Sequence, residues 1–539
     1  RVKMATFKQA NGYDQPGSSK RFLQSVNVDA NSADYDTLDK KEGAVALSRD
    51  LWMNNSLAQA ALKRIKSNTV GTGLKLQSRI QHDVLGLTVE QGRKWQREVE
   101  RRFNSWGASK DVDITRQQNF FELQDLVYFS TLLSGDVCVV YPHKQLKTLK
   151  SPVRIRVIES DLLSNPALMP HTSTIAGGIE LHADGSPKTY YFADQYPGGN
   201  VQGTVSAQWT PIPAFTSSGR RQVHHLFVKD RPGQRRGMPL LAPVVNDLMK
   251  VTKLKDSELT AHVISSFFTV FIKDMSGFAA PMAEGFTPPG MPSATDIEGN
   301  AVPNYNQGSH SMGSGNVTYL DDDKEVQIAD PRRMSDAFEP FFMSFVKQIS
   351  AAIELPFEQL LLHFSASYSA SRGALLEGWK ATRVRRSWLE TNFCKPTFQS
   401  WLDYEVANGS ISAPGFFEDE DIRTAWSQSS WSGMGNGQLD PLKESKAAVM
   451  KITNNLSTHE NEYNQMHDDG DWEGAMDRRE NEKDLLIEKD LVPLATVDAL
   501  TEVGEDNIST KSNPNLKDDL EDDSDNEDAK PKKEDEDES

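Results

Sequence analysis

Residues 231–273 read RPGQRRGMPLLAPVVNDLMKVTKLKDSELTAHVISSFFTVFIK, and they decide the fold because a rigid basic turn opens directly into a long helix. Pro232 fixes its own φ, while Gly233 and Gly237 allow backbone conformations that other residues disfavour. The first seven residues therefore predict a turn that sets the direction of the following helix. From Leu240 onward, apolar residues recur at three- to five-residue steps between charged ones. A helix with one apolar stripe requires a neighbour to cover it.

A second amphipathic helix is predicted further along the chain. It begins at Ser335, a good N-cap, and Phe338, Phe341, Phe345 and Ile349 share one face of it. Between the two helices lie about sixty residues rich in Gly, Pro and Ser, so a helical hairpin with a loop-rich tip is the simplest arrangement. The residues alone favour an ordinary hairpin in a monomeric core.

The other elements follow from periodicity and turn residues. Helices are predicted at 46–66, 87–106 and 119–133, and strands at 137–141, 153–159, 177–182, 188–193, 223–228, 317–320 and 325–328. Pro356 ends the second helix, and a new long helix is predicted from about Ala370 to Val406. A last helical part runs from Asp440 to about Val503. Its residues predicted to face inward are Leu442, Ala448, Val449, Ile452 and Leu456.

The net charge of −18 over 539 residues is concentrated at one end. Residues 517–539 hold 13 Asp or Glu and 4 Lys, a balance of −9, so residues 1–516 carry the other −9. Such a tail cannot bury enough apolar surface to offset its ordering entropy, and disorder is predicted. Cys138 and Cys394 are far apart and indicate core residues rather than a disulfide framework. The sequence contains no run of eighteen apolar residues, so no membrane-spanning helix is predicted.

Catalytic constellations do not emerge from the sequence. It contains no H-E-x-x-H, G-x-S-x-G or G-x-x-x-x-G-K-[ST] motif. His224 and His225 lie on an apolar strand without a spaced third ligand, which indicates a core or interface pair. The run Asp321-Asp322-Asp323 lacks the Gly and distal Glu of a calcium loop and is interpreted as a charged turn. No enzyme, metal or cofactor is therefore predicted, and the Trp426 and Trp431 rings are interpreted as packing.

Many ordered blocks resemble the portal proteins of tailed bacteriophages, specifically their lambda-like branch. The blocks are Arg49-Asp50-Leu51 with Asn54-Asn55, 68–74 (NTVGTGL), 121–124 (FELQ), 134–136 (SGD), 157–161 (VIESD), 177–180 (GGIE), 356–361 (PFEQLL) and 368–374 (YSASRGA). The most specific block is the turn Arg231, Pro232, Gly233, Gln234, Arg235, Arg236, Gly237. The resemblance covers roughly residues 45–490, too many blocks for a chance motif.

The resemblance implies an α+β portal-protein fold with an α/β wing, a two-helix stem, a loop-rich clip, a long tunnel helix and a helical crown. In chain order the implied parts are 1–45 flexible N-terminal arm, 46–237 wing, 238–273 stem helix 1, 274–334 clip, 335–356 stem helix 2, 357–371 tunnel loop, 372–439 long helix and return wing, 440–503 crown, and 504–539 disordered acidic tail. Since Arg1 rather than Met opens the chain, N-terminal processing is left open.

The resemblance also implies a function. The expected protein is a portal subunit in the virion, forming a dodecameric ring at one capsid vertex after assembly in the host cytoplasm, and a channel for packaging and ejection of double-stranded DNA. Expected partners are other copies of itself, the terminase large subunit, the major capsid and scaffold proteins, and head-completion or connector proteins, with no membrane and no cofactor. The alternatives are a monomeric helical-hairpin adaptor and, less favoured by its residues, a hydrolase.

Two sets of residues are the candidate DNA contacts. The implied tunnel-loop residues are His363, Ser365, Ser367, Tyr368, Ser369, Ser371 and Arg372. Low charge suits a surface over which phosphates slide, because each tight basic contact adds affinity. The second set is a basic helix face formed by Lys380, Arg383, Arg385 and Arg386. It is interpreted either as a phosphate or subunit contact or, equally, as a solvated face that pairs with acids.

Overall fold

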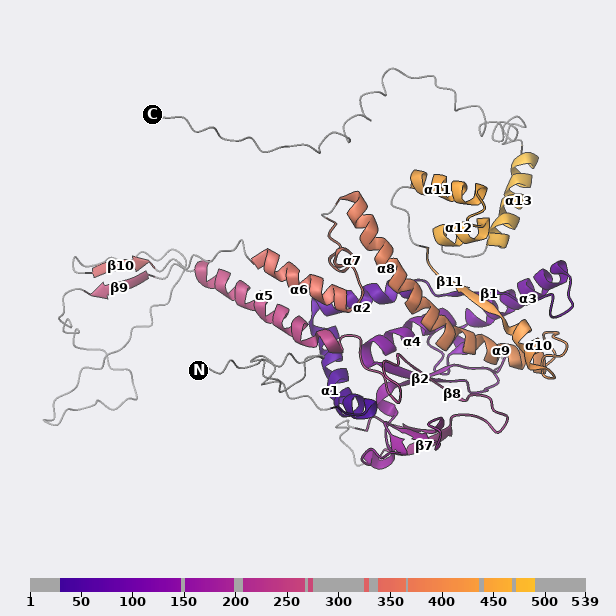
Figure 1. Ribbon diagram of the computed structural model, residues 1–539, viewed down its shortest axis with the longest axis horizontal. Coiled ribbons are helices and arrows are strands. Elements are labelled where there is room, and N and C mark those ends of the chain that lie inside the picture. Colours follow the sequence, from indigo (N-terminus) through magenta and orange to yellow (C-terminus); the bar gives the residue numbers. More distant parts are fainter. Residues whose placement is uncertain are drawn as a thin grey trace, which may run out of the picture. The chain divides into compact units, whose positions relative to one another are not determined.

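Helices and short sheets are combined in the computed structural model (Figure 1), which describes residues 30–146, 151–197, 207–266, 270–274, 324–328, 338–364, 367–435, 441–467 and 472–489. Helix α13 (Trp472–Glu488) belongs to a separate unit and is described by itself. All other described residues form one unit. The expected clip residues 276–316, the Asp321–Asp323 run and the acidic tail lie outside the described residues, as does the predicted strand 317–320.

The described chain opens with two helices, α1 (Ala33–Asn54) and α2 (Ser56–Thr69), where one helix was predicted. The Ser32 hydroxyl accepts a hydrogen bond from the Tyr35 N–H and so caps α1, and acidic residues occupy its first turn. The part of the expected loose arm from Ala33 onward is therefore helical. The Asn55 side chain caps α2 in the same way, which separates it from α1.

Two helices match their predictions closely. Both α3 (Val89–Gly107) and α4 (Phe120–Ser134) begin with a capping box, in which the cap side chain and the third helical residue exchange hydrogen bonds with backbone N–H groups. Helix α4 ends at Gly135, which adopts the left-handed conformation that glycine permits. The chain then enters a strand directly.

Two antiparallel sheets follow α4. In the first, β2 (Asp136–Val140) lies between β3 (Arg156–Glu159) and β8 (Val223–Phe227). The second sheet has the order β4-β5-β6-β7. Its strands are β4 (Ile175–Ala176), β5 (Ile179–Leu181), β6 (Pro187–Ala193) and β7 (Trp209–Pro213). The predicted strands in this region are confirmed, whereas β7 was missed because its two prolines are unfavourable in a strand.

A further two-stranded sheet joins distant parts of the chain. Strand β1 (Lys75–Ser78) pairs antiparallel with β11 (Ser429–Ser432), which follows α10 (Glu420–Ser427). Both strands are short and β11 is mostly serine, so neither has the β-branched, alternating pattern that predicts a strand. The interpretation of Trp426 and Trp431 as packing residues is confirmed. The first lies 4.7 Å from Trp95 between ring centroids, and the second 5.8 Å from Phe103.

The helix that follows the basic turn starts later than predicted. Helix α5 is Val245–Ser266, preceded by a 3-10 turn at Ala242–Val244. Pro243 lacks an N–H, so the chain enters the helix through this tighter turn, and the expected start of the helix at residue 238 is wrong. The predicted end is also wrong, because β9 (Val270–Asp274) pairs with β10 (Lys324–Ile328) in a two-stranded sheet. The prediction for 325–328 is confirmed.

The second amphipathic helix is α6 (Phe338–Ala352), while its predicted cap Ser335 lies outside the described residues. The expected tunnel-loop segment begins with a short helix, α7 (Phe357–Leu361), instead of an open loop. The predicted long helix is confirmed from Tyr368 to Ala407. It comprises α8 (Tyr368–Leu389), one turn of π-helix (Glu390–Cys394) and α9 (Lys395–Ala407).

The last helices of the first unit are α11 (Pro441–Thr453) and α12 (His459–Met466). The prediction of an inward apolar face here is wrong for most of its residues. Ala448 is buried, but Leu442, Val449 and Leu456 are exposed. Periodicity identifies residues that share a helix face, but it does not identify what covers that face.

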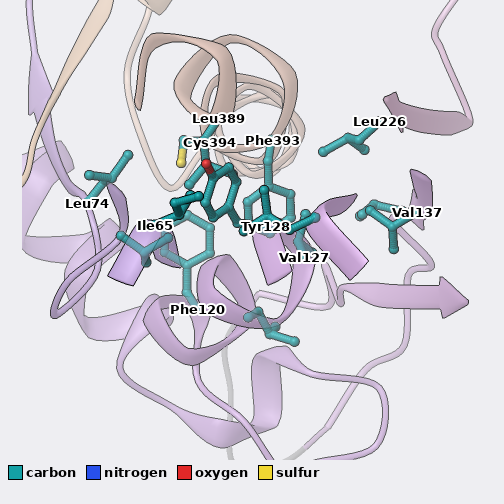
Figure 2. Packing of buried hydrophobic residues seen from close by; sticks show 14 of the residues in the cluster. Ile65, Leu74, Phe120, Val127, Tyr128, Val137, Leu226, Leu389, Phe393 and Cys394 are labelled. Carbon is teal, nitrogen blue, oxygen red and sulfur yellow. The ribbon is translucent and has the colours of Figure 1, made fainter. Parts of the chain in front are cut away.

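The main core lies where α2, α4 and the π-turn meet β2 and β8 (Figure 2). The labelled side chains include Ile65, Phe120, Tyr128, Phe393 and Cys394, which are fully or almost fully buried. Burial of Cys394 here, and of Cys138 in a smaller cluster, confirms both cysteines as core residues. The π-turn therefore places Phe393 and Cys394 at the centre of the fold.

Candidate functional site

The blocks quoted from the sequence converge on one buried carboxylate, Asp136, at the start of β2. The Arg236 guanidinium of the basic turn bonds it, with 2.5 Å between Nε and Oδ2. Asp136 is 1 % exposed and Arg236 4 %. Burial by itself raises the pKa of Asp136, but Arg236, Lys41 and His225 outweigh it and hold that pKa well below its usual range. The carboxylate is therefore charged inside the fold.

The remaining donors of Arg236 are also occupied. They reach the Leu163 carbonyl at 2.6 Å, the Gly177 carbonyl at 2.9 Å and the Ser160 carbonyl at 2.7 Å. The Ser160 hydroxyl donates in turn to Asp136. One guanidinium thus joins the turn to three other blocks of the resemblance, and its planar fork suits this role better than an ammonium group.

Two more side chains complete this cluster, which we call the Asp136 cluster: Lys41, Asp136, Ser160, His225 and Arg236. The Lys41 Nζ lies 3.1 Å from Asp136 Oδ1 and donates to the Ser134 and Gly237 carbonyls at 2.9 and 2.7 Å. Burial lowers the Lys41 pKa to about 8 although Asp136 opposes the shift. The His225 Nε2 lies 3.1 Å from Asp136 Oδ2, and burial lowers its pKa.

Two glycines let the backbone close around the cluster. A Cβ at Gly237 would lie 2.1 Å from the Gly135 carbonyl oxygen, and a Cβ at Gly135 would lie 2.5 Å from the Met238 carbonyl carbon. Gly135 also has φ +85°. Both positions therefore require glycine for contact, and Gly135 requires it for conformation as well.

The other two arginines of the turn hold the N-terminal helix. Arg231 Nη1 lies 2.5 Å from Asp36, and Arg235 Nε lies 2.9 Å from Asp34, both in the first turn of α1. Arg231 also donates to the Asn31 carbonyl at 3.0 Å. The basic turn is therefore paired with β2 through the buried Arg236, and with α1 through Arg231 and Arg235.

Arg49 makes a second link between α1 and the sheet. It forms ion pairs with Glu159, at 2.8 Å, and with Asp161, both from the VIESD block. Beside these residues is a cavity of about 410 Å³. Its lining includes Lys41, Asp161 and Arg236. All these charged groups already have protein partners, so the geometry describes a joint between α1, the sheets and the start of α5.

The histidine pair lies in the same sheet. His224 packs edge-on against Tyr141, with ring centroids 5.1 Å apart. Burial and the nearby Arg221 lower the His224 pKa to about 4. The interpretation as a core pair is confirmed. Among the residues that the structure describes, no three His, Cys, Asp or Glu side chains are grouped to bind a metal.

The expected tunnel-loop residues differ in their surroundings. His363, Ser367 and Ser369 are exposed. Ser367 caps α8 by accepting a hydrogen bond from the Ala370 N–H at 3.4 Å. Leu362, which ends α7, has φ +54° and an exposed side chain. The chain therefore turns sharply at Leu362, directly after α7.

The other members of this set are less accessible or are not described. Ser371 is buried, and Arg372 lies 4.0 Å from Glu444 of α11. Ser365 lies outside the described residues, and so does the side chain of Tyr368. The candidates for an open surface in this chain are thus fewer than the sequence indicated.

The basic helix face divides into two pairs. Lys380 and Arg383 are exposed, and Lys380 forms an ion pair with Glu377 at 2.5 Å. Arg385 donates to the Ile353 carbonyl at 2.6 Å. Arg386 instead binds the end of α2, where it donates to the carbonyls of Asn68 and Thr69 at 2.7 and 2.9 Å. Sequence spacing could not separate the inner pair from the outer one.

Arg386 also joins α8 to the segment after β11. It donates to the Met434 carbonyl at 2.7 Å, and its guanidinium lies 4.6 Å from the Trp379 ring centroid. A Cβ at Gly71 would lie 2.3 Å from Met434 Sδ. Gly71 of the NTVGTGL block therefore lies against the Met434 side chain, and its φ of +59° favours glycine at this position.

Comparison with known proteins gives consistent matches. The family model described as "Phage portal protein, lambda family" matches residues 19–386. The portal protein of Escherichia phage N15 is 24% identical over 456 residues, covering 83% of this chain and 85% of that protein. Portal protein B of Escherichia phage lambda is 24% identical over 477 residues, covering 86% and 88%.

Solved structures also match, at low similarity. A chain from the neck of a native gene transfer agent particle, computed with C12 symmetry, has a TM-score of 0.38 at 13% identity. A chain from the neck of an empty particle, computed with C6 symmetry, has 0.39 at 15% identity. Each match covers 71% of this chain and 92% of the other. At these scores the likeness supports no further conclusion.

Proposed function

This chain belongs to the lambda family of phage portal proteins, and on that premise we propose that it assembles head to tail into a closed ring of twelve copies at one vertex of the capsid. The match to the family model over residues 19–386 carries this proposal. Portal proteins are structural components of the phage particle rather than catalysts. Identical subunits that contact each other through two different faces close into a ring when the rotation between them closes.

Within this ring, the proposed parts follow the expected order. The two sheets and α1 to α4 would form the wing, α5 and α6 the stem, and the β9–β10 pair the base of the clip. Helix α8 would be the tunnel helix, and α11 and α12 part of the crown. The Asp136 cluster supports this division, since it fixes the start of α5 to the sheets with charged, fully buried contacts.

The proposed action is that of a conduit. Double-stranded DNA would pass through the channel during packaging and ejection. The exposed residues His363 and Ser367, before α8, and Ser369, in its first turn, would face the DNA. Hydroxyl groups without fixed charge add little phosphate affinity and would let DNA slide. The exposed Lys380 and Arg383 are the remaining candidates for phosphate contact.

Partners are part of the proposal as well. Terminase would dock at the clip during packaging, head-completion proteins would replace it, and capsid and scaffold proteins would surround the ring. Within the described residues, no helix has the length and apolar character to span a membrane.

Negative-stain electron microscopy with light scattering on the purified chain tests the proposal. We expect rings with an open centre and a mass near twelve times 60.1 kDa. A chain that stays monomeric at high concentration would contradict it and favour the monomeric adaptor. A hydrolytic activity that His225→Ala abolishes would favour the enzyme instead.

A further inference from the structure

Two arginines are buried in the part of the chain that the structure describes, and they differ in their partners. Arg236 is 4 % exposed and binds Asp136 and three backbone carbonyls. Arg154, in the segment that leads into β3, is 1 % exposed. No described carboxylate forms an ion pair or hydrogen bond with it. Arg154 is therefore a buried cation without a bonded counter-charge.

Only one side of the Arg154 guanidinium has protein partners. Its Nη1 donates to the carbonyl of Ser151 at 2.7 Å and to that of Val153 at 2.9 Å. Its Nε and Nη2 are buried and have no hydrogen-bond partner among the described residues. These two nitrogens share one edge of the guanidinium plane, and such an edge can bind two oxygens of a carboxylate or phosphate group in parallel. The unused edge is therefore suited to an oxyanion.

A second unused donor lies in the same place. The Ser151 hydroxyl is buried and also lacks a partner within the described part of the chain. The carbonyl of the same residue accepts the bond from Arg154 Nη1, so the hydroxyl lies close to the guanidinium. Buried polar atoms of folded proteins nearly always have partners. Three unpartnered donor atoms side by side therefore indicate a missing acceptor.

The acidic residues near Arg154 already have partners. Burial lowers the pKa of Arg154, and the nearby Asp111 opposes this shift only in part. The Asp111 carboxylate is bonded to Arg116, with 2.6 Å between Oδ1 and Nε. Asp113, in the same turn, is 4 % exposed and accepts two backbone N–H groups. Neither acid is bonded to Arg154.

The missing acceptor must also be negatively charged. A buried water molecule can accept hydrogen bonds, but it carries no charge. A buried charge that lacks a counter-charge destabilises the folded state. An anion with at least two oxygens supplies both the acceptors and the charge. The donors and the charge of Arg154 therefore select an oxyanion over a neutral molecule.

The Arg154 guanidinium lies close to the protein surface. The side chain of Arg116, whose charge acts on Arg154, is 56 % exposed. Lys110 and Lys144, on the two flanking segments, are exposed as well. These three cations would attract an anion. The exposed Arg116 side chain can move without disturbing the core, which would give a small ion access to Arg154.

We propose that Arg154 and Ser151 form a binding site for one oxyanion, held by the Arg154 Nε and Nη2 donors and the Ser151 hydroxyl. The ligand class comprises phosphate ions and carboxylate groups. The site shares no residue with the Asp136 cluster, and it does not rest on the proposed ring.

Denaturation midpoints of the full-length chain test the site in sodium chloride, sodium phosphate and sodium acetate at equal pH and ionic strength. A ligand that binds only the folded chain raises the midpoint, and the increase grows with ligand concentration. We expect a higher midpoint in phosphate, in acetate or in both than in chloride. An increase in phosphate alone identifies phosphate as the ligand, and an increase in acetate alone identifies a carboxylate.

Three variants separate the site from general salt effects. Arg154→Met removes the charge at similar length, so its midpoint in chloride should equal or exceed that of the unmodified chain, and the ion-specific increase should disappear. Arg154→Lys keeps the charge without the two-donor edge and should weaken the apparent affinity about tenfold. Lys110→Gln is the matched control. It removes an exposed charge beside the site and should change the affinity less than about twofold.

Two results would overturn the site. One is the same ion-specific increase in Arg154→Met as in the unmodified chain, because the effect would then come from salt in general. The other is no increase in the unmodified chain in either phosphate or acetate. If Arg154→Met does not fold, Ser151→Ala decides the question, since loss of one hydroxyl keeps the charge and should weaken the apparent affinity about fivefold. An unchanged affinity in Ser151→Ala would then overturn the site.

Discussion

At the scale of single residues, the chain depends on charges that are buried and fully paired. The sequence predicted that the RPGQRRG segment is a turn, and Gly233 with φ +83° and the hydrogen bond from the Gln234 N–H to the Arg231 carbonyl confirm it. It did not predict that Arg236 alone is buried. Three arginines at close spacing look alike, and their partners come from segments up to 201 residues away.

Removing one partner of the Asp136 cluster is expected to be costly. Asp136→Asn leaves Arg236 and Lys41 buried without a counter-charge, and loss of one partner of a buried pair costs about 3–5 kcal/mol. Chemical denaturation measures the free energy of unfolding. As a control, Glu180→Gln breaks a more exposed pair with Lys188 and should cost less than about 1 kcal/mol. Equal losses for the two variants would contradict the central role of the cluster.

The histidine pair makes stability depend on pH. Because burial lowers the His224 pKa to about 4, the unfolded chain binds its proton first as the pH falls below its ordinary value of about 6.5. Stability is therefore complete above that value and lost as the pH falls toward 4, by about 1–2 kcal/mol at pH 5 after allowing for partial exposure. Denaturation midpoints at pH 7 and pH 5 measure the loss.

The variant His224→Gln should show a smaller change between these two pH values. The change that remains belongs in part to His225 and His143, whose pKa values are lowered by burial in the same direction. A pH dependence identical to that of the unmodified chain would exclude His224 as its source.

At the scale of elements, capping residues and amphipathic periodicity predicted the helices well. Helix starts that depend on a proline or on tertiary contacts were not predicted. The predictions at 87–106 and 119–133 are confirmed because each helix carries its own capping box. The start of α5 was missed because Pro243 shifts the first hydrogen bond. The π-turn was missed because its hydrogen-bond pattern has no residue signature.

The passage from β8 to α5 depends on close backbone contact. Gly237→Ala places a methyl group against the Gly135 carbonyl, and we expect a loss of about 3 kcal/mol, since the backbone must move away. Gly233→Ala is the matched control in the same turn. It has φ +83° but open space around it, so only conformational strain of about 1–2 kcal/mol is expected. A larger loss in Gly233→Ala would show that conformation, and not contact, is limiting.

The π-turn between α8 and α9 is expected to tolerate a deletion. A π-turn contains one more residue than an α-turn, so removal of the exposed Thr391 allows ordinary α-helix while both flanks keep their faces. Removal of the exposed Ser387, in regular α8, rotates the start of α8 by about 100° relative to Phe393. Cooperative thermal unfolding should persist in the Thr391 deletion and weaken in the Ser387 deletion. The reverse order would contradict this account.

At the scale of the whole molecule, the resemblance predicted the family, and the residues predicted a mixed fold with two amphipathic helices around an insertion. What could not be predicted is how the ends join. The pairing of β1 with β11 involves two short polar segments, and neither contains a local signal for the other. The hydrogen bonds from Arg386 to the Asn68, Thr69 and Met434 carbonyls could not be predicted for the same reason.

The β1–β11 pair and the Arg386 hydrogen bond to Met434 make the stability of the fold depend on residues 429–434. A chain that ends after Gly435 keeps β11 and the Met434 carbonyl, and it should unfold at a denaturant concentration similar to that of a chain ending after Lys489. A chain that ends after Gln428 loses both and exposes the aromatic core beside Trp431. We expect it to lose at least about 3 kcal/mol by denaturation. Similar stability of the two short chains would show that β11 is dispensable.

The same closure constrains how the protein folds during its synthesis. Gln77 and Ser430, which meet across the β1–β11 pair, are 353 residues apart. A ribosome that adds about 5–20 residues per second needs roughly 20–70 seconds to make the intervening chain. During that interval the N-terminal part of the chain must wait with strand β1 unpaired, while α5 with its exposed Met249 and Leu259 has already emerged. Host chaperones would therefore meet this chain as an unfinished fold, and premature contact between neighbouring nascent copies is the hazard they would have to prevent.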